Sequence, residues 1–182
     1  MTTRRTVLLA GAGLLALNAA RPARADCRSS LLTQDSAAAA CTVLRLAADT
    51  SRGRRQGLTV SLGRLRSLPQ AIIRTALPAN FQTAGSVSWQ GPTLGSLLEL
   101  LDLPCEQGVY AKSLNGYGAL LPRKDLLDYA PILAWLRNGK PMSVRGNGPL
   151  MVIYPFDSHA ILRQDVRYLQ RTVWQVQSLT MV

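Results

Sequence analysis

Short apolar segments, separated by glycine, proline and asparagine, run through most of the chain. Residues 58–62 (LTVSL) alternate apolar and polar positions, which is the period of a half-buried strand. Residues 87–89 predict a second short strand, and residues 150–156 are continuously apolar, as in a central buried strand. A final strand is expected over residues 173–181.

Two Asn-Gly pairs predict β-hairpins, because this dipeptide readily adopts the left-handed conformations of a tight turn. One pair is Asn115 with Gly116, and the other is Asn138 with Gly139. The strands joined by these turns are expected over residues 109–114 and 118–121, and over residues 132–137 and 141–144.

Helix signals are fewer. Thr93 suits the cap of a helix that carries leucines on one face. Ser67 and Pro69 suit the start of a helix, so we expect one over residues 67–77. Each of these helices would follow or precede a short strand.

Other helical segments complete the pattern. Residues 125–129 predict one or two helical turns that Pro131 ends, and residues 158–170 predict mixed helix and loop. For residues 26–56 we expect a short helix followed by a flexible basic loop. Short strands at close spacing with a few helices between them indicate the α+β fold class with a mixed β-sheet.

The first 25 residues have the features of a signal peptide. Arg4 and Arg5 precede an apolar run over residues 7–20, and residues 23–25 supply a small-x-small cleavage pattern. The run is shorter than the about 20 residues that a membrane-spanning helix needs. The paired arginines favour the twin-arginine export pathway, so we expect a periplasmic or secreted protein with no transmembrane segment after leader removal.

The rest of the chain is short enough for one domain. We divide it into an N-terminal extension over residues 26–56 and a domain over residues 57–182. The net charge of +11 favours anionic partners, such as a small anionic ligand. Nucleic acid is not expected, because the arginines are scattered and aromatic residues are few.

Three cysteines occur in a chain expected to reach an oxidising compartment, which predicts one disulfide and one free thiol. Cys27 can pair with Cys41, or Cys41 with Cys105. The spacing of the cysteines does not choose between these pairings.

The residue types present argue against several common kinds of functional site. His159 is the single histidine and no C-x-x-C occurs, so a zinc site is not expected. His159 is adjacent to Asp157 and Ser158, but sequence neighbours seldom converge as a catalytic triad does. No nucleotide-binding glycine motif is present after the leader. We therefore assign no catalytic and no metal-ligating residue.

The residues that remain suit an anionic ligand. Arg145 precedes Gly146, Asn147 and Gly148, a turn in which backbone N–H groups can converge on an anion while the guanidinium adds a bidentate donor. Asn115 and Tyr117 occupy a second loop that can face the same ligand. The alternative is that both are ordinary hairpin loops, with Arg145 solvated.

The C-terminal half of the chain resembles a known family. The segments RGNGPLMVIYP (145–155) and TVWQVQSLTMV (172–182), with residues 114–150 and more weakly 87–101, resemble the molybdopterin-binding domain of the sulfite oxidase family. The resemblance is closest to its small secreted single-domain branch and covers residues 57–182. It implies a sulfite-oxidase-type fold and a pterin cofactor held near the Arg145 turn.

The sequence departs from that family at the metal ligand. The family's enzymes bind molybdenum through the pterin and one cysteine thiolate, which lies ahead of the strand that reads VSW in this chain. Here residues 76–89 contain no cysteine, and Thr83, a hard oxygen donor, is nearest to the vacated position. Cys105 follows the next helix. The lysine that related enzymes carry near Trp174 is also missing.

Three functions are compatible with these features. The first is a non-catalytic ligand-binding or accessory module that lacks the molybdenum ligand. The second is an active periplasmic molybdopterin-dependent oxidoreductase with an unusual coordination sphere. The third is a basic domain that binds an anionic membrane surface or assists a sensor protein. The sequence identifies no protein partner.

Overall fold

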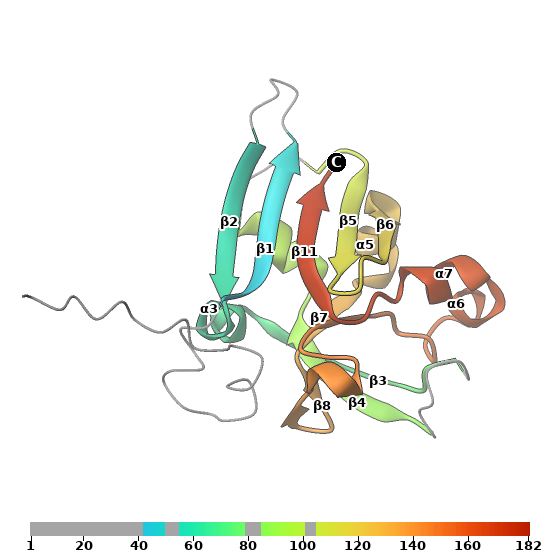
Figure 1. The fold of residues 1–182 in the computed structure, drawn as a ribbon. Coiled ribbons are helices and arrows are strands. Elements are labelled where there is room, and N and C mark those ends of the chain that lie inside the picture. The colour runs from blue at the N-terminus through green and yellow to red at the C-terminus, as the bar shows by residue number, and fades with distance from the viewer. Residues whose placement is uncertain (1–41, 50–54, 79–84, 101–104) are drawn as a thin grey trace, which may run out of the picture.

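The computed structural model describes residues 42–49, 55–78, 85–100 and 105–182 (Figure 1). The predicted leader, Cys27, Cys41 and Thr83 lie outside these residues. No helix among the described residues has the length and apolarity that crossing a bilayer requires.

A five-stranded sheet forms one side of the protein, in the order β2-β1-β11-β5-β6 (Figure 1). β1 and β11 are parallel, and the other neighbours are antiparallel, so the sheet is mixed as expected. β11 occupies the middle of the sheet. The strands are β1 (Thr42–Asp49), β2 (Arg55–Ser61), β5 (Gly108–Ser113), β6 (Gly118–Pro122) and β11 (Val176–Met181).

The helix expected within residues 26–56 was wrong where the structure describes that segment. Leu44, Leu46 and Ala48 are buried at 1%, 2% and 1% exposure, while Arg45 between them is exposed. This period of two is that of a strand with one face on the core. β1 is a sheet strand, and the boundary predicted at residue 57 falls inside its partner β2.

Two smaller sheets pack beside the first (Figure 1). One has the order β3-β4-β8-β9 and the other pairs β10 with β7. Their strands are β3 (Gln70–Thr75), β4 (Val87–Pro92), β7 (Ile132–Ala134), β8 (Leu136–Arg137), β9 (Lys140–Pro141) and β10 (Met151–Ile153).

The helix predicted over residues 67–77 was also wrong, since Ser67 ends a helix and β3 follows it. Ile72 and Arg74 are exposed while Ile73 is partly buried and Thr75 fully buried. This alternation, with two adjacent β-branched isoleucines, favours a strand over a helix.

Residues 150–156 are buried almost throughout, as predicted, but they do not form a central strand. Only β10 pairs, and only with β7. Beyond it, Pro155 has no N–H to donate, and the Phe156 N–H turns back to the Tyr154 carbonyl at 2.9 Å. The final strand also starts later than predicted, after Gln175 adopts a left-handed φ of 52°.

The helices are short, and their starts follow local signals. Thr93 caps α4 by accepting the Ser96 N–H at 3.1 Å, which confirms the predicted cap. The helical segment that Pro131 follows and the mixed segment over 158–170 are also confirmed. The helices are α3 (Leu62–Ser67), α4 (Leu94–Glu99), α5 (Arg123–Tyr129), α6 (Ala160–Gln164) and α7 (Val166–Arg171).

One hydrophobic core connects the three sheets. It extends from Leu46 and Leu179 on the five-stranded sheet, through buried β7 and β10, to Trp89 of β4. β4 and β7 approach so closely that a Cβ at Gly91 would lie 2.0 Å from the Leu133 carbonyl oxygen. The core therefore fixes the positions of the loops that leave these strands.

Candidate functional site

The two loops that carry the predicted site residues meet at one end of the five-stranded sheet. The Arg145 loop is residues 143–149 and contains a 3-10 turn, η2 (Val144–Gly146). The Asn115 hairpin is residues 113–118 and joins β5 to β6. Both loops contact Gln175, directly before β11.

Gln175 bridges the loops with three hydrogen bonds. Its backbone N–H donates to the Asn147 carbonyl at 3.0 Å, and its own carbonyl accepts the Leu114 N–H at 2.9 Å. Its side-chain Nε2 donates to the Val144 carbonyl at 2.8 Å. Gln175 therefore joins the two loops at the start of β11.

Two backbone donors of the Arg145 loop are satisfied within the loop itself. The N–H of Gly146 donates to Ser143, and so does that of Gly148, at 2.8 Å from the Ser143 carbonyl oxygen. A Cβ at Gly148 would lie 2.4 Å from the Met142 carbonyl, so glycine is required there. No hydrogen bond joins the Arg145 guanidinium or the Asn147 side chain to another described residue, so both can contact a ligand.

The Asn115 hairpin is held by its predicted site residues. The Asn115 side-chain oxygen accepts the Tyr117 N–H at 2.9 Å, and Gly116 has a φ of 91°. The Tyr117 hydroxyl donates to the Gln170 carbonyl at 2.7 Å, which ties the hairpin to α7. Asn115 and Tyr117 therefore shape the loop, and the exposed Tyr117 ring leaves an aromatic surface beside it.

The charge at this end of the sheet is positive. Arg145 is exposed, and no hydrogen bond or ion pair joins it to another described residue. Neither loop contains an aspartate or glutamate. This arrangement is able to bind a small anion without a competing internal carboxylate.

Cys105 lies at the opposite end of the sheet. Its Sγ donates to the Gly108 carbonyl at 3.2 Å, where β5 begins, whereas the loops meet where β5 ends. Five residue steps along a strand place the two ends roughly 17 Å apart. Burial raises the pKa of the Cys105 thiol above 9.0, against a smaller lowering by the nearby Arg123.

A second polar cluster, which the sequence did not predict, lies inside the protein. Asp125 of α5 is 4% exposed, and its Oδ2 accepts the Tyr154 hydroxyl at 3.0 Å and Arg171 Nη1 at 2.8 Å. Burial, with the Asp125 charge, raises the pKa of Tyr154 well above its usual range. The cluster joins α5, α7 and the residue that follows β10, and spans 46 residues of sequence between Asp125 and Arg171.

Aromatic rings surround this cluster. The Tyr129 and Tyr168 hydroxyls lie 3.3 Å apart, and this hydrogen bond, with burial, raises the pKa of Tyr168 to about 12. The His159 ring meets the Tyr129 ring edge-on at 5.1 Å between centroids. His159 is thus partly exposed and packed against an aromatic side chain.

The segment over residues 76–89, which contains no cysteine, is anchored at Ala76, directly after β3. Asp157 Oδ2 accepts the Ala76 N–H at 2.8 Å, and Thr75 Oγ1 accepts the Asp157 N–H at 3.1 Å. Arg163 pairs with Asp157 and also donates to the Ala76 carbonyl. These contacts fix Ala76, while Thr83 lies outside the described residues.

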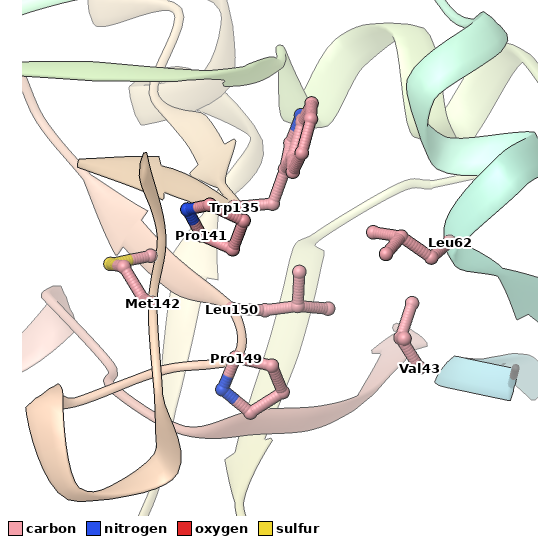
Figure 2. Close-up of a pocket in the computed structure, with 7 residues that line it drawn as sticks. All are labelled: Val43, Leu62, Trp135, Pro141, Met142, Pro149 and Leu150. Carbon is pink, nitrogen blue, oxygen red and sulfur yellow. The ribbon is translucent and has the colours of Figure 1, made fainter. Parts of the chain in front are cut away.

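A small apolar hollow of about 10 Å³, which is room for a single water molecule, lies beside the Arg145 loop (Figure 2). Figure 2 shows Leu62 and Val43 on one side and Trp135 on the other. The lining is completed by Pro141, Met142, Pro149 and Leu150.

The fold has a counterpart among solved structures. The chain is similar to the sulfane dehydrogenase SoxCD from Paracoccus pantotrophus, with a TM-score of 0.52 and 16% sequence identity. The match covers 76% of this chain and 38% of that one, so this chain spans well under half of its length. No protein-family model matches the sequence, and no curated protein matches it.

The similarity shows a shared fold. The predicted α+β class with a mixed sheet and short helices is confirmed, and the sulfite-oxidase-type fold implied by the sequence resemblance is supported.

The donors present suit the organic part of a pterin cofactor better than its metal. The two loops offer a guanidinium, side-chain amides and a tyrosine ring, which can hold a phosphate or a pterin. They offer no thiolate, and the described residues contain no group of three His, Cys, Asp or Glu side chains that could hold a metal ion. A soft metal centre does not fit this donor set.

Proposed function

We propose that this protein is a ligand-binding or accessory module on a sulfite-oxidase-type fold, exported to the periplasm. A small anion or a pterin binds at the Arg145 loop and the Asn115 hairpin, and no protein thiolate anchors molybdenum there. The observation that carries this proposal is the position of sulfur in the described part of the chain. Residues 76–89 contain no cysteine, and Cys105 lies at the far end of β5 from both loops.

The chemistry of the loops supports an anionic ligand. Arg145 is exposed and has no partner among the described residues, and the loops carry no carboxylate. The guanidinium can therefore bind two oxygens of one oxyanion. Asn147 and Asn115 add neutral donors that would orient the ligand.

Replacing Arg145 tests the ligand assignment. Arg145→Ala should weaken binding of sulfite, phosphate or a soluble pterin at least tenfold, because a hydrogen bond to a charged group contributes about 1.5 to 3 kcal/mol. Calorimetric titration gives the affinities, and circular dichroism should show an unchanged fold. Arg64→Ala, which removes an exposed arginine on α3, is the matched control and should bind as the unmodified protein does. If Arg145→Ala binds these anions as tightly as the unmodified protein does, Arg145 is an ordinary surface residue and the ligand assignment is wrong.

The second candidate is an active molybdopterin-dependent oxidoreductase. The structural similarity to a sulfane dehydrogenase favours it. The predicted twin-arginine leader also favours it, since that pathway exports folded proteins that already hold a cofactor. We prefer the binding module because an enzyme would need a soft metal ligand that neither loop provides.

A further inference from the structure

The side chain of Gln175 holds the turn that presents Arg145. Its Nε2 donates to the Val144 carbonyl at 2.8 Å. Val144 begins the 3-10 turn η2, and its carbonyl carbon is bonded to the Arg145 nitrogen within one planar peptide unit. A hydrogen bond to the Val144 oxygen therefore fixes the peptide plane from which Arg145 continues.

The backbone of Gln175 holds the other end of the same turn. Its N–H donates at 3.0 Å to the carbonyl of Asn147, which ends η2 with a left-handed φ of 69°. Arg145 lies between these two contacts. Gln175 itself has a left-handed φ of 52° and directly precedes β11, the central strand of the five-stranded sheet. The turn is thus tied at both ends to one residue that is continuous with the sheet.

Holding the turn matters for binding because ordering a loop around a ligand costs free energy. The Arg145 side chain is exposed and has no partner in the described part of the chain, so its backbone is the part that the protein can orient in advance. The backbone N–H at position 175 comes with almost any residue. The contact with the Val144 carbonyl requires a side-chain donor of the right length, and glutamine supplies it.

We propose that Gln175 is a positioning residue of the anion site, and that its side-chain amide orients Arg145 toward the ligand. This inference rests on the proposed function, because it concerns the same site. It adds a residue outside both loops to those that determine the affinity, and that residue acts through Arg145 instead of on the ligand.

Gln175→Asn tests the side chain alone. Asparagine tolerates a left-handed φ, so the backbone contacts at position 175 should persist. Its side chain is one methylene shorter, so its amide should no longer reach the Val144 carbonyl. The matched control is Gln177→Asn, because Gln177 Nε2 donates to the Ser113 carbonyl at 2.9 Å, a contact of the same kind on the Asn115 hairpin.

Phosphate titrated into the full chain, followed by nuclear magnetic resonance of the Arg145 backbone amide, measures the effect, with sulfite and a soluble pterin titrated in parallel. Gln175→Asn should weaken binding about threefold to tenfold, as expected when one orienting hydrogen bond is lost. Gln177→Asn should bind within about twofold of the unmodified protein, although both variants lose one hydrogen bond and should lose similar stability in urea.

A double-mutant cycle separates positioning from a general structural role. In the presence of Arg145→Ala, Gln175→Asn should weaken binding no further, because a positioning residue acts only through the group that it positions. The same measurement on the Gln177→Asn variant should show no coupling to Arg145.

Three results would overturn the inference and leave the anion site in place. The first is Gln175→Asn binding phosphate as tightly as the unmodified protein while Arg145→Ala binds it weakly. The second is equal weakening by Gln175→Asn and Gln177→Asn, and the third is undiminished weakening by Gln175→Asn when Arg145→Ala is present. Unchanged binding by Arg145→Ala alone would instead overturn the proposed function, and this inference with it.

Discussion

Asp125 places a carboxylate inside the protein, where it holds together three elements. Tyr154 and Arg171 both donate to its Oδ2, and the side chains of Asp125 and Arg171 are 6% and 19% exposed. Removing one member of a buried ion pair leaves the other charge without compensation. Asp125 is therefore a structural residue where α5, α7 and the chain after β10 meet.

Asp125→Asn should lower the free energy of unfolding by about 2 to 3 kcal/mol, somewhat below the usual range for a fully buried pair because Arg171 still reaches solvent. Urea unfolding at neutral pH measures the change. Asp128→Asn is the matched control on the same helix. It removes an exposed pair with Lys124 and should leave the unfolding free energy nearly unchanged. Equal stability of Asp125→Asn and the unmodified protein would show that the pair contributes nothing.

At the scale of the elements, β4 and β7 pack closely against each other in the core. A Cβ added at Gly91 would lie 2.0 Å from the Leu133 carbonyl oxygen, and both residues belong to paired strands. Gly95 in α4 differs, because its nearest neighbour would be the Thr93 Oγ1 at 3.8 Å. The two glycines make a matched pair only four residues apart.

Gly91→Ala should destabilise the protein by about 3 kcal/mol or more, because the strands must separate to admit the methyl group. Gly95→Ala should instead stabilise it by roughly 0.5 to 1 kcal/mol, because alanine favours the helix. Denaturant midpoints for the two variants, compared with that of the unmodified protein, give both values. A stable Gly91→Ala variant would contradict the close approach of β4 and β7.

Elements with a local signal could be predicted from the sequence, and elements defined by distant partners could not. Thr93 caps its own helix, and Asn115 with Gly116 turns its own hairpin, so a few adjacent residues sufficed. β1 lies between β2, which follows it in the chain, and β11, more than 100 residues away. Its short apolar segment fitted a helix equally well until that partner was known.

The candidate site, too, could be predicted only in part. The two loops were predicted from their glycine and asparagine residues, but their meeting at Gln175 depends on where β11 begins. The Asp125 cluster has no sequence motif, because its members come from separate segments of the chain. Paired donors and acceptors of this kind are visible only after the chain has folded.

At the scale of the whole molecule, the fold is similar to that of a sulfane dehydrogenase, while the sulfur that would anchor a metal is absent from the expected segment. Cys105 does not replace it, because the length of β5 separates it from the loops. The central claim is that this fold serves here to bind a ligand without protein-ligated molybdenum.

Elemental and pterin analysis of the protein, exported by its native host and purified without oxygen, tests this claim most directly. We expect molybdenum far below one atom per chain, whether or not a pterin or another small anion is retained. Molybdenum at one atom per chain would contradict the binding-module account and identify the protein as a redox enzyme with an unusual ligand.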